Sequence, residues 1–168
     1  MGVAVTLPLL PPKGLAEIKR VFGDPSPYFR EDGRIGPQWE AAILGVLHLP
    51  APLTLGWDLS KTVSRIRVHQ AILQPTHRAL KAIHEAGLWD ELRTFDGAYN
   101  FRSKRTSRRL SLHCWGVALD FNASEDPQGD EQIEMAEGVV RAFEHEGFEW
   151  GGRWATPDPM HYQYARGY

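Results

Sequence analysis

Two short clusters in the C-terminal half of the sequence hold side chains that could bind a metal ion. The first contains His113 and Asp120, and the second contains Asp158 and His161. Two imidazoles and a carboxylate are ligands that suit zinc, and they leave a fourth position open. Asp158 lies three residues before His161, close enough for one to bind metal while the other reaches the metal's water. The pattern therefore favours a divalent-metal site.

The spacing within the first cluster leaves a second interpretation open. His113 and Asp120 are seven residues apart, so on one straight strand they would face opposite sides. Gly116 lies between them and could supply a bend or bulge that brings both to one face. Alternatively, His113 is a hydrogen-bonded strand histidine, Asp120 closes a turn, and the pair Asp158 and Pro159 forms a turn or cap.

The elements that must position these clusters are a mixture of helices and short strands. Apolar residues at helical spacing, followed by glycine, predict helices over 15–22, from 68 or 75 to 86, and over 131–146. The third of these has an apolar stripe of Ile133, Ala136, Val140 and Phe143. Strands are expected over 43–49, 92–95, 99–102, 110–121, 148–150 and 161–165. This order predicts an α+β fold, a small antiparallel sheet flanked by helices, in a single domain over residues 1–168.

The two clusters also carry a family resemblance. The run Ser-x-His-x-x-Gly-x-Ala-x-Asp from Ser111 and the run Trp-Gly-Gly-x-Trp…Asp-x-Met-His-Tyr from Trp150 are similar to the zinc-site motifs of the D-alanyl-D-alanine carboxypeptidase family. That family includes phage L-alanyl-D-glutamate endolysins and vancomycin-resistance dipeptidases. Residues 14–24 resemble its N-terminal helix, and residues 97–102 resemble the segment with its active-site arginine. The resemblance implies a zinc site on the sheet, in a fold shared with hedgehog signalling domains.

The resemblance implies a role for each residue that matches the motifs. It makes His113, Asp120 and His161 the ligands of Zn2+, and it makes Asp158 the general base. Asp158 is shorter than the glutamate of many members, so it must approach the water more closely. Arg102 matches the arginine that stabilises the developing oxyanion. Two residues are expected to contact substrate, Ser111 beside the first ligand and Trp154 in an aromatic wall.

The implied function is a zinc metallopeptidase, a hydrolase whose partner is the peptidoglycan stem peptide. The length of the chain, the lack of a leader and the Asp-x-x-His pattern favour a lytic, endolysin-like L-alanyl-D-glutamate endopeptidase. A D-alanyl-D-alanine carboxypeptidase is the alternative within the family. A non-catalytic zinc-containing recognition module of the cell wall is the alternative from another class, because hedgehog domains keep zinc in the same fold.

Composition excludes several other classes. The net charge of −2 disfavours a nucleic-acid-binding protein, so we expect the basic segment from Arg102 to Arg109 to be a solvated loop. The lone cysteine, Cys114, excludes an internal disulfide and is expected to be buried and inert. No apolar run is long enough to span a membrane. We see no secretory signal, so we expect the protein to stay in the cytoplasm until it is released to the cell wall. We also expect it to be a monomer.

Overall fold

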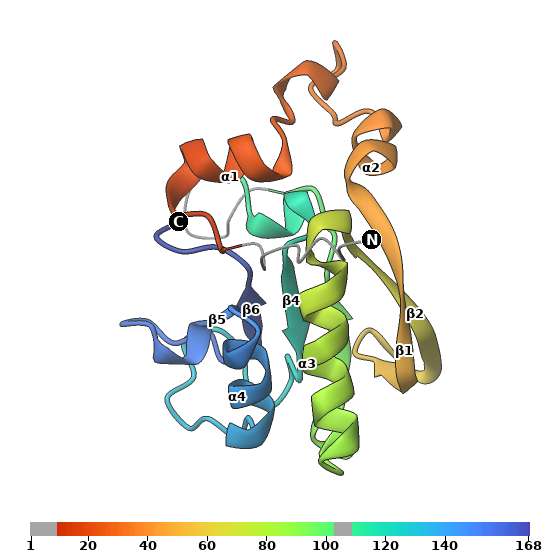
Figure 1. Ribbon diagram of the computed structural model, residues 1–168, viewed down its shortest axis with the longest axis vertical. Helices are drawn as coiled ribbons and strands as arrows, with labels where there is room; N and C mark the ends of the chain where they lie inside the picture. Colours follow the sequence, from red (N-terminus) through yellow and green to blue (C-terminus); the bar gives the residue numbers. More distant parts are fainter. Residues whose placement is uncertain (1–9, 103–108) are drawn as a thin grey trace, which may run out of the picture.

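A six-stranded sheet forms the centre of the computed structural model, which describes residues 10–102 and 109–168. Its strand order is β2-β1-β3-β4-β6-β5. The strands are β1 (Leu44–Leu55), β2 (Asp58–His69), β3 (Phe95–Gly97), β4 (Ala118–Phe121), β5 (Glu149–Trp150) and β6 (His161–Gln163). The helices are α1 (Gly14–Phe22), α2 (Pro37–Ile43), α3 (Leu73–Glu85) and α4 (Glu137–His145). The α+β class is therefore confirmed (Figure 1).

The predicted small antiparallel sheet is wrong in both size and strand direction. The sheet has six strands, and β1 and β3 pair in parallel through Leu55 and Phe95. The chain returns between them through β2 and α3, which allows a parallel pairing. Strand β2 was missed because its residues are mostly polar, and β1 was predicted to stop at Pro50. A register shift between His48 and Leu53 instead carries β1 past the prolines, as irregular pairing permits.

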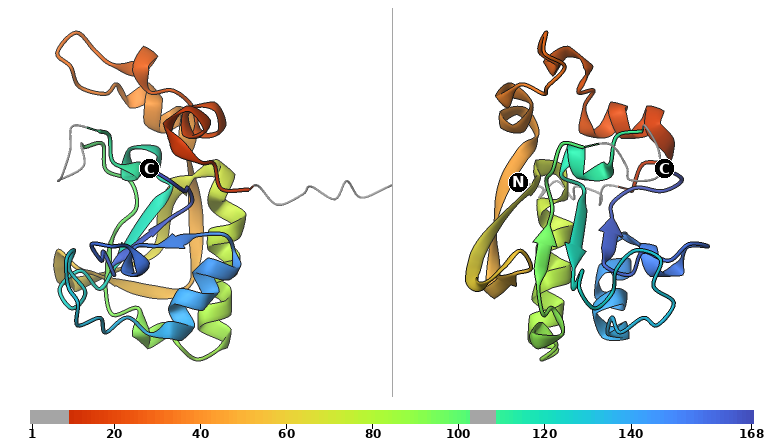
Figure 2. Two further views of the ribbon diagram at one scale, coloured as in Figure 1. Left: turned by 90° about the vertical axis from the view of Figure 1, so that its left-hand side faces the viewer. Right: turned by 180° about the vertical axis from the view of Figure 1, so that it is seen from behind.

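Helices α3 and α4 pack side by side against one face of the sheet (Figure 2, left). Leu80 and Ile83 of α3 and Val140 and Phe143 of α4 are buried there. The ring of Phe143 lies 4.5 Å from the ring of Tyr162 in β6, and 5.7 Å from that of Phe121 in β4. These contacts fix which face of β4 and β6 packs against the helices.

The opposite face of the same strands carries the polar residues. Successive residues of a strand point to opposite faces, so Asp120 points away from the helices when Phe121 points toward them. His161 and Gln163 likewise flank Tyr162 and share the face of Asp120. Since Asp120 is paired directly with His161 in the antiparallel register, the two side chains meet on that face.

Two predicted elements differ near the site. The expected strand over 110–121 is a 3-10 turn, Leu112–Trp115, followed by the short strand β4. The helix expected from residue 131 begins only at Glu137, and Ile133 is 36% exposed. The carboxylate of the buried Asp126 accepts hydrogen bonds from the backbone N–H groups of Glu134 and Met135, and these bonds hold the segment before α4 out of the helix. The helices predicted over 15–22 and up to 86 are confirmed as α1 and α3.

Candidate metal centre and active-site pocket

His113 is positioned by a tight turn, since it lies in the 3-10 segment ahead of β4. The hydroxyl of Ser111 accepts a hydrogen bond from the His113 backbone N–H at 3.3 Å and begins the turn. Gly116 ends it in the left-handed region, with φ of 65°, which a residue without a Cβ adopts at little cost. The predicted bend at Gly116 is therefore present and turns the chain from His113 into β4.

The side chains of His113, Asp120 and His161 converge at one point. Asp120 Oδ1 lies 2.9 Å from His161 Nδ1, and Asp120 Oδ2 lies 3.1 Å from His113 Nε2. One ligand atom from each residue lies within 4.8 Å of the other two. The two imidazole rings are 5.2 Å apart and nearly perpendicular. A carboxylate therefore lies between two imidazole nitrogens, the arrangement expected of three ligands of one ion.

The hydrogen-bond partner of His113 Nδ1 determines whether the other ring nitrogen, Nε2, has a lone pair for a metal ion. His113 Nδ1 lies 2.9 Å from the carbonyl oxygen of Ala98, which only accepts, so Nδ1 carries the proton and Nε2 keeps a lone pair. His113 Nε2 is buried and makes no hydrogen bond. Asp120 Oδ2 lies 3.1 Å from it without the geometry of a hydrogen bond. Such a buried, unused lone pair beside a carboxylate is the feature that a bound cation would satisfy.

Electrostatics keep the carboxylate of this group charged. Burial alone would raise the pKa of Asp120, but the neighbouring His113 and then His161 outweigh burial and hold that pKa well below its usual value. Burial alone would lower the pKa of His161, and its hydrogen bond with Asp120 raises the pKa instead. The centre therefore offers an anionic ligand at neutral pH.

Asp158 is held at the edge of this centre by backbone contacts. Its N–H donates to the carbonyl of Gly151 at 2.9 Å, and its carbonyl accepts from the N–H of His161 at 3.0 Å. A Cβ atom on Gly151 would lie 2.5 Å from the carbonyl oxygen of Asp158, so only glycine leaves room for this turn. The turn expected at Asp158 and Pro159 is present, and it places the carboxylate beside the second histidine.

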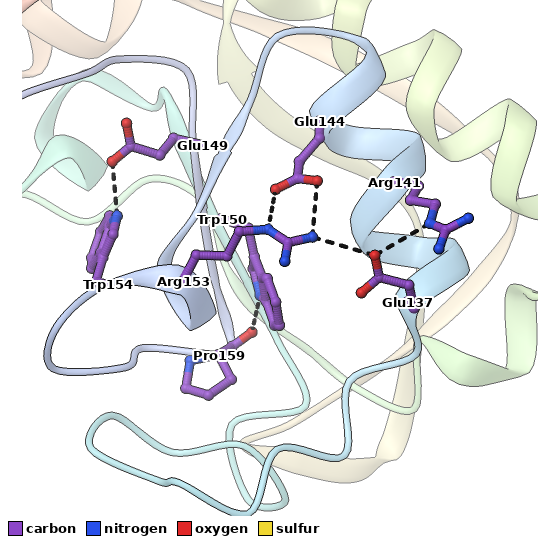
Figure 3. Close-up of polar contacts among 8 residues, drawn as sticks. All are labelled: Glu137, Arg141, Glu144, Glu149, Trp150, Arg153, Trp154 and Pro159. Carbon is purple, nitrogen blue, oxygen red and sulfur yellow. Dashed lines mark hydrogen bonds and ion pairs between the residues drawn. The ribbon is translucent and has the colours of Figure 1, made fainter.

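The segment that carries Asp158 is anchored to α4 and β5 (Figure 3). Arg153 donates to Glu144 and Glu137 of α4, and the Trp150 indole N–H donates to the carbonyl of Pro159 at 2.7 Å. The Trp154 indole N–H donates to Glu149 at 2.8 Å. These contacts hold the loop between β5 and β6 in place, and with it one wall of the site.

A pocket of about 520 Å³ opens over the centre. All seven residues predicted to form the site line it: Arg102, Ser111, His113, Asp120, Trp154, Asp158 and His161. Sequence reasoning missed other lining residues, among them Gln128, Met160, Gln163 and Tyr168. Only Gln163 had a usable signal, since it lies two residues after His161 and so shares its strand face.

One further histidine and the lone cysteine are buried outside the candidate metal centre. His69 is buried, and its Nε2 bonds with the carbonyl of Phe22, so its role is structural. Cys114 is buried as predicted, and burial raises the pKa of its thiol to about 11. Its Sγ contacts the backbone of Arg102 and anchors that segment to the turn of His113. Most of the basic segment after Arg102, residues 103–108, lies outside the described residues.

Comparison with known families supports the site. Residues 104–164 match the model of a family described as D-alanyl-D-alanine carboxypeptidase. This segment contains His113, Asp120, Asp158 and His161, and the match supports the family resemblance carried by the two motifs. No curated protein and no solved structure matches the chain. Among the described residues, no helix is long and apolar enough to cross a membrane.

Proposed function

We propose that this chain of the D-alanyl-D-alanine carboxypeptidase family is a zinc peptidase that hydrolyses peptidoglycan stem peptides, most specifically as an L-alanyl-D-glutamate endopeptidase. The observation that carries the proposal is the convergence of His113 Nε2 and His161 Nδ1 on the two oxygens of Asp120. Two imidazole nitrogens and a carboxylate, brought together in a largely buried group, favour a cation between them. The family match supports a peptidase of this kind.

The residues present fit zinc. His113, Asp120 and His161 would hold it, because two imidazoles and one carboxylate leave a position open for substrate. When bound there, zinc would supply a lowered pKa for its bound water and polarisation of the scissile carbonyl.

The remaining chemistry falls to side chains in the same pocket. Asp158 accepts a proton from the attacking water and later delivers it to the leaving amine, as a general base and then a general acid. The Arg102 guanidinium, which lines the pocket, stabilises the negative charge growing on the carbonyl oxygen. Trp154 offers an aromatic surface against which the peptide packs. Ser111 acts mainly through His113, whose backbone it holds.

Two reactions of the family compete for this site. The Asp-x-x-His pattern of Asp158 and His161 favours the endopeptidase, in which the peptide continues on both sides of the scissile bond. The description of the matching family favours the carboxypeptidase, which releases a terminal D-alanine. The two differ in product, so one digestion separates them.

The deciding experiment is digestion of purified peptidoglycan with zinc-loaded protein, followed by mass spectrometry of the products. New L-alanine C-termini with free D-glutamate amines, abolished by EDTA, are expected. Release of D-alanine alone would select the carboxypeptidase. Stoichiometric zinc without product from several wall types would contradict the peptidase and favour a recognition module.

A further inference from the structure

A chain of hydrogen bonds runs from the metal centre to the wall of the pocket. His161 Nε2 lies 3.1 Å from Gln163 Oε1, and Gln163 Nε2 lies 3.5 Å from Glu149 Oε1. The same Glu149 oxygen accepts the indole N–H of Trp154 at 2.8 Å. The Trp154 ring also faces the imidazole of His161, with the ring centres 5.6 Å apart. Glu149 therefore joins a candidate ligand and a candidate substrate contact through one carboxylate oxygen.

The orientation of the Gln163 amide follows from its neighbours. Its nitrogen lies near two groups that can only accept, the carbonyl of Ala165 at 3.1 Å and the carboxylate of Glu149. Turning the amide over would place its oxygen against both acceptors in a site where Gln163 is 2% exposed. The amide oxygen must therefore face His161.

This orientation sets the tautomer of His161. An amide oxygen only accepts, so Nε2 of the ring carries the proton and donates it. Nδ1 is left to face Asp120 Oδ1 from 2.9 Å, where it donates to the carboxylate when it carries a proton and offers its lone pair to a zinc ion when it does not. His113 reaches the same state through the carbonyl of Ala98, but a backbone carbonyl has no freedom to turn. Only the His161 side depends on a side chain that must itself be held.

Glu149 keeps the Gln163 amide in this orientation. It lies in β5, opposite Gln163 in the antiparallel register, and it is half-buried. Among the residues described, no Lys or Arg side chain forms an ion pair with it. Its carboxylate instead accepts hydrogen bonds from the N–H groups of Trp154 and Gln163. A charged acceptor at this point is what keeps the Gln163 amide from turning over.

We propose that Gln163 and Glu149 are positioning residues that fix the metal-binding tautomer of His161 and couple it to Trp154. The inference rests on the proposed function in that His161 is taken as a zinc ligand. Substrate that packs on Trp154 would then affect Glu149, the same carboxylate that holds Gln163 against His161. Outer partners of this kind commonly change metal affinity by about 10- to 100-fold when they are removed.

The test measures zinc affinity by competition with a chromophoric chelator, together with nitrogen NMR shifts of His161 in protein labelled at histidine. Gln163→Leu should weaken zinc binding by about 10- to 100-fold, and in the metal-free protein at alkaline pH it should move the proton of His161 partly to Nδ1. Glu149→Gln should produce the same two changes to a smaller extent. Glu85→Gln, an exposed glutamate at the end of α3, is the matched control and should change neither.

A charge swap separates positioning from simple packing. Gln163→Glu alone brings two carboxylates together and should weaken both folding and zinc binding. Combined with Glu149→Gln, it places a carboxylate beside His161 and an amide that can donate to it, so zinc affinity should rise above that of Gln163→Glu alone and stay below wild type, because the carbonyl of Ala165 then faces an oxygen. Rescue by the swap is not expected if Gln163 only fills space.

The proposal is overturned if Gln163→Leu folds and binds zinc as wild type does, or if Glu149→Gln leaves the His161 shifts unchanged. These outcomes leave the proposed function intact, since zinc and cleavage would persist. If the wild-type protein binds no zinc, the proposed function fails first, whereas the tautomer of His161 is still read from the metal-free NMR spectrum.

Discussion

The β1–β2 hairpin and the β4–β6 pair belong to one sheet but are built in opposite ways. The hairpin strands are twelve residues each, shift register twice, and expose Trp57 and Leu59 near the turn. Strands β4 and β6 are four and three residues long, and nearly every side chain in them is buried. Short strands fixed on both faces hold side chains to one geometry, whereas a long hairpin tolerates irregular pairing. Two of the three candidate metal ligands, Asp120 and His161, accordingly lie on the short strands.

The largest contrast between the two regions concerns histidine. His161→Ala should abolish zinc binding and activity, because it removes a ligand from the buried centre. His48→Ala, in the exposed part of β1, should leave both unchanged. Metal content by atomic emission after dialysis checks the pair. Stoichiometric zinc in the His161 variant would refute its assignment as a ligand.

Aspartate gives the next contrast. Asp158→Ala should keep its zinc and lose about 10²- to 10⁴-fold in cleavage rate, the range for a general acid or base. Asp58→Ala, at the start of β2, removes a turn contact with Ser60 and Lys61 and should cleave normally. Cleavage rates of both variants with matched zinc content are the measurement. A wild-type rate in the Asp158 variant would remove this residue from the mechanism.

Substitution of one leucine in each region compares how tightly the two regions are packed. Leu119→Ala, fully buried in β4, should lower the free energy of unfolding by about 2–5 kcal/mol. Leu59→Ala, 71% exposed in β2, should change it by less than about 0.5 kcal/mol. Urea unfolding followed by tryptophan fluorescence tests the difference. Equal losses would show that the hairpin is packed as tightly as the site.

Glycine gives the smallest expected difference. Gly116→Ala adds a Cβ at positive φ that would lie 2.7 Å from a methyl of Leu44 and 3.1 Å from the backbone of His69. Gly87→Ala has the same strain, with φ of +70°, but open space around it. Both should lose about 1–3 kcal/mol from backbone strain, and Gly116→Ala should lose more and also bind zinc more weakly. Thermal unfolding and zinc titration of the two variants measure this, and equal behaviour would contradict a role for the turn in placing His113.

Much of the site could be predicted from the sequence because it depends on residue type and local spacing. The ligand types at His113, Asp120 and His161, and the bend at Gly116, follow from chemistry and chain geometry alone. Helices α1 and α3 follow from apolar periodicity and the glycines near their ends. The predicted strand through His113 was wrong because the Ser111 cap and Gly116 form a turn whose hydrogen bonds outweigh strand propensity.

Tertiary structure decided the rest, since it depends on contacts between distant segments. Pairing of Asp120 with His161 requires the register of β4 with β6, and the extent of the sheet requires the β1–β3 contact made after a long return. The delayed start of α4 depends on the carboxylate of Asp126. The tautomers depend on Ala98 and Gln163, which the motifs do not contain. The sequence by itself determined which groups could bind a metal, and only the assembled sheet decided that these groups meet, because the register of β4 with β6 sets which side chains lie opposite each other.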